Sequence, residues 1–209
     1  MSGKYKIVAR ENGLLPENIH LSEERALSIE METGTGKTLV YIKTIFELFK
    51  HYNFTKFIIL VPSVAIREGV LASFQNFNKQ LEDIYGFTPN VFEYDIKRLS
   101  KVSNFIEEQH PQMMIITLAC FNSEDKILNQ AQTEDLFNNI PFIEAIGKTQ
   151  PVIIINEPQE GRDTNNPVRQ ISKLNPLVKI RNSATHKIVK NLIYRLTPYE
   201  SYKNGWVKK

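Results

Sequence analysis

A stretch near the N-terminus combines glycine, lysine and hydroxyl side chains in a pattern that suits phosphate binding. It runs from Met31 to Thr38 and reads METGTGKT. Its two glycines permit backbone conformations and a close approach that a Cβ would hinder. Where such a loop opens a helix, unpaired N–H groups and the helix dipole both favour an anion. The sequence therefore predicts a nucleotide-phosphate loop made by Thr33, Gly34, Thr35, Gly36, Lys37 and Thr38.

Two side chains in this loop have distinct expected roles. Lys37 should reach the β- and γ-phosphates of ATP, and the hydroxyl of Thr38 should bind Mg²⁺. The predicted cofactors are therefore ATP and Mg²⁺. The general pattern G-x-x-x-x-G-K-[ST] places glycine where this chain has Met31. The alternative is a chance glycine-rich turn, and the neighbouring elements decide between the two.

A phosphate loop must lie between a strand and a helix. Residues 26–31 alternate apolar with polar side chains, which predicts a strand, although a more polar one than a fully buried parallel strand. After the loop, Ile42, Ile45, Phe46 and Phe49 recur at the spacing of one helix face. This context favours the phosphate loop over a chance turn.

A second reactive group follows the apolar run Val152 to Ile155, which predicts a buried strand. Glu157 comes directly after that strand, where a carboxylate beside a phosphate loop can act as the general base for the attacking water. The residue before it normally is Asp and holds Mg²⁺; here it is Asn156. The alternative is a surface turn, but two signals in the right order on the right elements favour a catalytic pair.

Two further groups are weaker candidates. Ser183, Ala184 and Thr185 follow a predicted strand at 177–180, and the hydroxyls of Ser183 and Thr185 could bond Glu157 or the γ-phosphate and so couple nucleotide state to DNA. Ser63 is a predicted N-cap after the strand 57–61, with Arg67 in the next turn of a helix that reaches about residue 81. We predict a DNA-phosphate contact there. An ordinary capped helix with a solvated arginine is the simpler alternative.

The remaining segments complete an α/β pattern. We expect an N-terminal extension or edge strand over 1–25, a polar loop over 122–132 and a parallel sheet of about five to seven strands with helices on both faces. Further strands are predicted at 91–94, 113–118 and 192–196, and further helices at 99–109, 134–146 with a break at Pro141, 168–174 and 198–204.

Composition is that of an ordinary globular domain. The chain has 209 residues, 42% of them hydrophobic, which is enough apolar material for a core. Its formal net charge of +3 is compatible with a polyanionic partner. Cys120 is the single cysteine, so no internal disulfide can form and a reducing cytoplasm fits. No signal peptide or membrane span is predicted.

These motifs together resemble the ATPase part of the restriction subunit of type III restriction-modification enzymes, in helicase superfamily 2. Helicase-like ATPases often keep TGTGKT without the first glycine. Glu-Pro in the acidic motif is discriminating, since RNA helicases of the superfamily place Ala there. The resemblance covers nearly the whole chain and is carried by residues 31–38, 61–69, 157–159, 183–186 and 194–196.

The resemblance implies a RecA-like ATP-binding domain over 26–209, without the second RecA-like domain or the nuclease domain. Its implied partners are double-stranded DNA, a modification methyltransferase subunit and the remainder of the restriction subunit, and its implied compartment is the cytoplasm. The family has Asp where this chain has Asn156. Two alternatives stay open: a fragment of another superfamily 2 DNA helicase or translocase, and a non-catalytic remnant that at most binds DNA or a partner.

Overall fold

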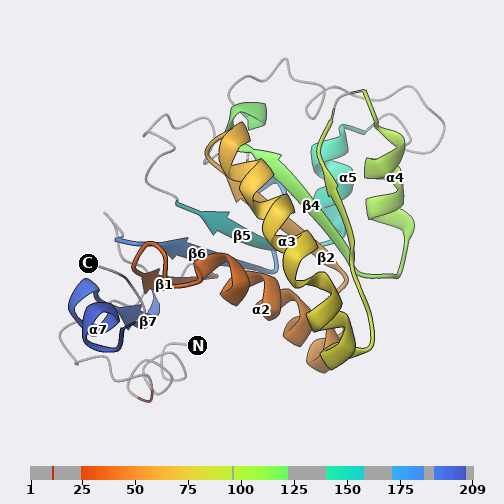
Figure 1. Cartoon of the computed structure of the whole chain (residues 1–209). Coiled ribbons are helices and arrows are strands. Elements are labelled where there is room, and N and C mark those ends of the chain that lie inside the picture. The colour runs from red at the N-terminus through yellow and green to blue at the C-terminus, as the bar shows by residue number, and fades with distance from the viewer. Residues whose placement is uncertain are drawn as a thin grey trace.

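The computed structural model describes residue 11 and residues 25–95, 97–121, 140–157, 171–185 and 191–205. Seven strands of these residues form one sheet in the order β3-β4-β2-β5-β6-β1-β7, and every neighbouring pair is parallel (Figure 1). The strands are β1 (Ala26–Met31), β2 (Lys56–Val61), β3 (Asn90–Glu93), β4 (Gln112–Thr117), β5 (Val152–Asn156), β6 (Val178–Ser183) and β7 (Leu192–Leu196).

Helices cover both faces of the sheet, as predicted. Strand side chains that alternate between the two faces build two apolar clusters, one against α2 and α3 and one against α4 and α5. The fold is therefore an α/β domain of the RecA-like kind. The helices are α2 (Lys37–Tyr52), α3 (Val64–Tyr85), α4 (Ser100–Glu107), the short 3₁₀ turn η2 (Leu118–Phe121), α5 (Phe142–Lys148) and α7 (Pro198–Lys203).

The polar residues that alternate along β1 are buried inside the sheet. Ser28 is fully buried and Glu30 is 6% exposed, so the polar side chains do not face water. The Glu30 carboxylate instead accepts a hydrogen bond from Nε of Arg195, its register neighbour on β7, at 2.5 Å. A carboxylate inside a parallel sheet is retained because a cation from the edge strand neutralises it.

Three predicted boundaries were wrong. Strand β6 extends through Ser183, so residues 181–183 belong to the strand and not to the loop after it. Helix α3 reaches Tyr85 because its apolar face continues to Leu81, and Gly86 ends it in the left-handed conformation. Pro141 is the N-cap of α5, where its missing N–H costs nothing, and does not interrupt a helix.

Several predicted features lie outside the described residues. They are the N-terminal segment before residue 25 apart from residue 11, the loop at 122–132, residues 134–139 and 168–170 of two predicted helices, Pro158, Gln159, His186 and the last four residues. Within the part of the chain that is described, no helix is long and apolar enough to cross a membrane.

Candidate active site

The phosphate loop joins the carboxyl end of β1 to the first turn of α2. Gly34 and Gly36 have φ of 82° and 91°, in the left-handed region where a side chain is strained. A Cβ at Gly36 would meet no atom within 4 Å, so the conformation and not lack of space requires glycine there. Thr35 tightens the turn, since its hydroxyl donates to the carbonyl of Glu32 at 2.6 Å.

The first turn of α2 carries no acidic side chain of its own, although the Glu32 carboxylate accepts from the N–H of Thr33 in the loop at 2.9 Å. Gly36 is the N-cap of α2 and provides no side-chain hydrogen bond. The first N–H groups of a helix have no partners within the helix. These donors and the helix dipole therefore favour a phosphate at this position.

Lys37, Glu157 and Ser183 form a connected polar chain at this edge of the sheet. The Nζ atom of Lys37 lies 2.7 Å from Oε1 of Glu157, and the two side chains are 13% and 21% exposed. Oγ of Ser183 donates to Oε2 of Glu157 at 2.8 Å. The same hydroxyl lies 2.8 Å from the carbonyl oxygen of Thr185, so its single proton serves one acceptor at a time.

The backbone at Glu157 is strained in a way that directs its side chain. Its φ is 52°, a left-handed value that a non-glycine residue adopts at a cost of about 1–3 kcal/mol. The N–H of Glu157 donates to the carbonyl of Asn182 on β6 at 2.8 Å, which holds the turn in place. This turn ends β5 and brings the carboxylate to Lys37.

Buried polar groups lie on the α2 face of the sheet. Asn156 ends β5 and is 8% exposed, and Asn182 is its register neighbour on β6. Strand alternation places them on the same face as Ile154 and Ile180, which pack against α2. Both carboxamide atoms of Asn182 are buried with no hydrogen-bond partner among the described residues, and the buried hydroxyl of Tyr41 on α2 has only the Thr38 hydroxyl near it. Burial raises the pKa of Tyr41 to about 12, and the nearby Thr38 hydroxyl offsets part of this increase.

These residues fit Mg²⁺ held mainly by a nucleotide. Thr38 and Asn156 supply oxygen atoms without charge, and no cluster of three His, Cys, Asp or Glu residues that could hold a metal occurs among the described residues. Mg²⁺ commonly keeps several waters and binds substrate phosphates together with one or two protein ligands. Thr38 and Asn156 are the residues that would contribute to such a site.

Ser63 and Arg67 lie at the same edge, at the start of α3. The Ser63 side chain accepts a hydrogen bond from the N–H of Ile66 at 3.3 Å, so the predicted cap is present. Arg67 is not the solvated arginine of the simpler alternative. Its Nη2 atom lies 2.9 Å from a carboxylate oxygen of Glu68 and 2.9 Å from one of Glu93. A DNA phosphate would have to displace these carboxylates.

The fold brings most of the predicted site together. The carboxyl ends of β1, β5 and β6 are neighbours in the sheet, so the phosphate loop, the Asn156–Glu157 pair and Ser183 to Thr185 meet at one edge. Sequence reasoning missed the orphaned Asn182 and Tyr41. For Asn182 the usable signal was its place two residues after the core residue Ile180, which the wrong strand boundary concealed.

Comparison with known proteins identifies the family. A family model described as type III restriction enzyme, res subunit, matches residues 5–188. The chain belongs to this family. It is 30% identical over 214 residues to the Type III restriction-modification enzyme EcoPI Res subunit of Escherichia phage P1, with 92% of this chain and 22% of the relative covered. It is 28% identical over 210 residues to the EcoP15I Res subunit of Escherichia coli, with 90% and 21% covered.

The chain thus spans about a fifth of the length of these Res relatives. A solved structure of a nuclease-deletion mutant of the Type ISP restriction-modification enzyme LlaGI, in complex with a DNA substrate mimic, superposes with a TM-score of 0.54. That alignment covers 97% of this chain and 20% of LlaGI at 18% identity, so it concerns the fold. The predicted family and fold are confirmed.

Proposed function

We propose that this Res domain binds ATP with Mg²⁺ at the phosphate loop and hydrolyses it with Glu157 as general base. The observation that carries the proposal is the contact of 2.7 Å between Lys37, the first residue of α2, and Glu157. It brings the expected phosphate-binding cation and the expected base together at the N-terminus of α2. A γ-phosphate bound there would take the place of the Glu157 carboxylate at Lys37.

ATP binding exchanges the partner of Lys37. The Lys37 ammonium neutralises Glu157 at 2.7 Å, and with ATP it turns to the β- and γ-phosphates. Glu157 is then free to accept a proton from water while the water oxygen bonds to the γ-phosphorus and the bond to the β–γ bridging oxygen breaks. The products are ADP and inorganic phosphate. Mg²⁺, when bound, neutralises charge that develops on the phosphate oxygens.

Ser183 positions the base during this exchange. Its hydroxyl holds Oε2 of Glu157 at 2.8 Å, so the carboxylate keeps its orientation after Lys37 leaves. The hydroxyl can also donate to the carbonyl of Thr185 at the same distance. We infer that exchange between these acceptors lets residues 183–185 respond to nucleotide state, which is the coupling role predicted for them.

Asn156 is expected to slow the reaction. An amide oxygen offers Mg²⁺ and its waters no negative charge, and one lost charge-assisted hydrogen bond corresponds to about 1.5–3 kcal/mol. Turnover by this chain is therefore expected to be weak. The same observation favours a second candidate function, a non-catalytic remnant that at most binds DNA or a partner subunit.

In the whole protein we propose that ATP hydrolysis is coupled to movement along, or cleavage of, double-stranded DNA. The proposed partners are a modification methyltransferase subunit and the remainder of the Res subunit, in the cytoplasm. The support is that EcoPI and EcoP15I are type III restriction-modification enzymes and that LlaGI was solved with a DNA substrate mimic. The family match favours this biology over an unrelated superfamily 2 translocase.

Calorimetric titration with ATP and Mg²⁺ tests the proposal. The unaltered chain should bind, and Lys37→Ala should abolish binding. Lys43→Ala is the matched control, because Lys43 is exposed on the same helix and should leave binding unchanged. Absence of binding by the unaltered chain, or unchanged binding by Lys37→Ala, would contradict the proposal and favour the remnant.

A further inference from the structure

An open depression of about 560 Å³ lies beside the phosphate loop, and neither Lys37 nor Glu157 is among the described residues that line it. Its volume is within the range of small-molecule pockets. One wall is the phosphate loop itself and the other is the carboxyl end of the edge strand β7. The described residues that line it are Met31, Gly34, Thr35, Gly36, Tyr194 and Leu196.

The order of strands fixes which end of a nucleotide can reach this depression. Glu157 follows β5, which is separated from β1 by β6, whereas β7 lies on the other side of β1. At about 4.8 Å between neighbouring strands, β5 and β7 are roughly 14 Å apart along this edge. A triphosphate whose γ-phosphate lies between Lys37 and Glu157 therefore extends along the loop toward β7.

The lining is suited to a flat apolar ring. Met31 and Leu196 are register partners at the ends of β1 and β7, and both are 6% exposed. Tyr194 lies two residues before Leu196, on the same face of β7, and pairs in register with Ile29. Aromatic faces stack on nucleobases, and methionine makes favourable contacts with ring edges. The Thr35 hydroxyl is already bonded to the carbonyl of Glu32.

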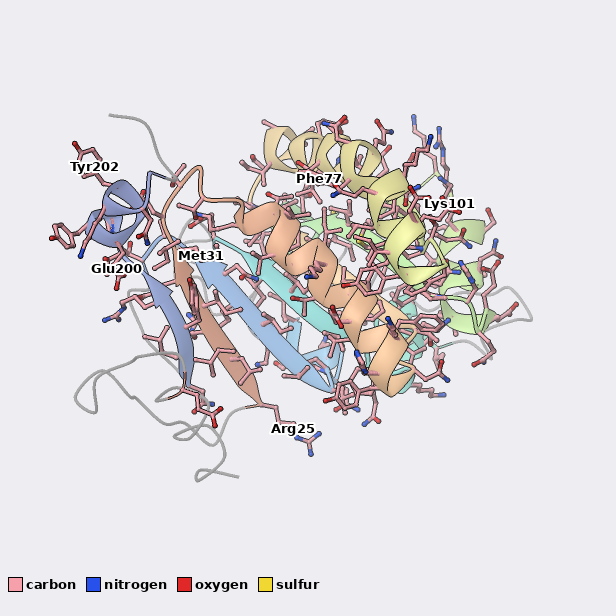
Figure 2. All side chains as sticks on the ribbon, turned by 60° about the horizontal axis from the view of Figure 1, so that its bottom comes forward. Arg25, Met31, Phe77, Lys101, Glu200 and Tyr202 are labelled. Atoms are coloured by element: carbon pink, nitrogen blue, oxygen red, sulfur yellow. The ribbon has the colours of Figure 1, made fainter. Side chains whose placement is uncertain are left out.

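Figure 2 shows that Met31 lies at the end of β1 nearest α7. Helix α7 starts directly after β7, and its N-cap Thr197 forms a capping box with Glu200. This box fixes the chain that leaves Leu196, so the β7 side of the depression is set by local hydrogen bonds.

We propose that this depression is the nucleoside subsite, in which the base of the bound nucleotide packs on Tyr194, beside Met31 and Leu196. The inference rests on the proposed function, because the phosphate loop must hold the triphosphate for the base to be delivered here. It adds the residues that hold the base, which the phosphate-loop motif does not specify. The base is held by packing on these side chains.

The experiment compares ATP with inorganic tripolyphosphate, which lacks base and ribose. Both are titrated with Mg²⁺ into the unaltered chain, Tyr194→Ala and Tyr194→Phe, with Tyr52→Ala as control because Tyr52 is 67% exposed at the far end of α2. Tyr194→Ala should weaken ATP roughly tenfold to a hundredfold and leave tripolyphosphate unchanged. Tyr194→Phe should restore ATP binding, since the ring is kept.

The outcomes separate this inference from the function on which it rests. Failure of the unaltered chain to bind either ligand would overturn both. If tripolyphosphate binds and ATP binds no more tightly, the subsite alone is overturned. An equal effect of Tyr194→Ala on the affinities for the two ligands would also overturn the subsite alone. If Tyr194→Ala does not fold, light-dependent labelling of the unaltered chain by 8-azido-ATP decides: label on the peptides with Met31, Tyr194 or Leu196 is expected, and label only elsewhere would overturn the subsite.

Discussion

Neutralising Glu157 should separate nucleotide binding from hydrolysis. In Glu157→Gln the side chain keeps its size and can still accept from Ser183, but it loses the charge that holds Lys37 at 2.7 Å. The variant should bind ATP more tightly and hydrolyse it far more slowly. Binding should tighten because the carboxylate competes with a γ-phosphate for Lys37, and hydrolysis should slow because the general base is lost.

The size of the expected gain in ATP affinity follows from how deeply the Lys37–Glu157 pair is buried. With side chains 13% and 21% exposed, the contact is neither a solvated surface pair nor a fully buried one. A hydrogen bond between charged groups contributes about 1.5–3 kcal/mol, and the lower end applies after partial screening. ATP no longer has to break that contact in the variant, so affinity should rise roughly tenfold. Loss of a general base should slow hydrolysis by roughly a hundredfold to ten-thousandfold.

Binding is measured by calorimetry, and hydrolysis by phosphate release in a single turnover with enzyme in excess. Glu82→Gln is the control, because Glu82 is an exposed carboxylate on α3 and should change neither quantity. Unchanged hydrolysis by Glu157→Gln would refute its role as base. Unchanged or weaker ATP binding would refute the argument that the Lys37–Glu157 contact opposes the nucleotide.

Three further predictions concern neighbouring groups. Asn156→Asp should raise Mg²⁺-dependent ATP affinity roughly tenfold to a hundredfold, measured by calorimetry; an equal gain when EDTA replaces Mg²⁺ would show that the metal is not involved. Arg67→Ala should weaken duplex DNA binding and reduce the magnitude of the slope of log affinity against log salt by about 0.9. Glu93→Gln frees Arg67 from one carboxylate and should strengthen DNA binding. A salt slope that Arg67→Ala leaves unchanged in a fluorescence titration would show that Arg67 does not contact DNA. Burial raises the pKa of Tyr41 to about 12, so the folded state favours the neutral phenol over the phenolate. As the pH rises from 10 to 12, the free energy of unfolding should therefore fall by roughly 2 kcal/mol. Denaturant unfolding should show a smaller loss over this pH interval in Tyr41→Phe, and an identical loss in both chains would contradict the assignment.

The elements of the proposed site were predictable because each carries its own local signal. The glycines of the phosphate loop, the helical spacing after it and the uniform apolar run before Glu157 depend only on near neighbours in sequence. Parallel connection then places the strand ends at one edge. This is why the phosphate loop and Glu157 could be assigned to one site before their contact was known.

The features that sequence did not reveal depend on distant partners. Glu30 looked too polar for a buried strand because its counterion, Arg195, lies 165 residues further along the chain. Arg67 looked free because Glu93 is on another element. The end of β6 was misjudged because Asn182 is polar yet fully buried, and its place two residues after Ile180 was the only local sign that it continues the strand.

A crystal structure of the chain with Mg²⁺ and a non-hydrolysable ATP analogue tests the central claim most directly. The quantity to measure is the distance from Nζ of Lys37 to its nearest acceptor. The proposed exchange predicts that Lys37 leaves Glu157, now 2.7 Å away, and lies within about 3.2 Å of a β- or γ-phosphate oxygen. An analogue bound away from the phosphate loop, or a Lys37–Glu157 contact that persists beside bound phosphates, would contradict it.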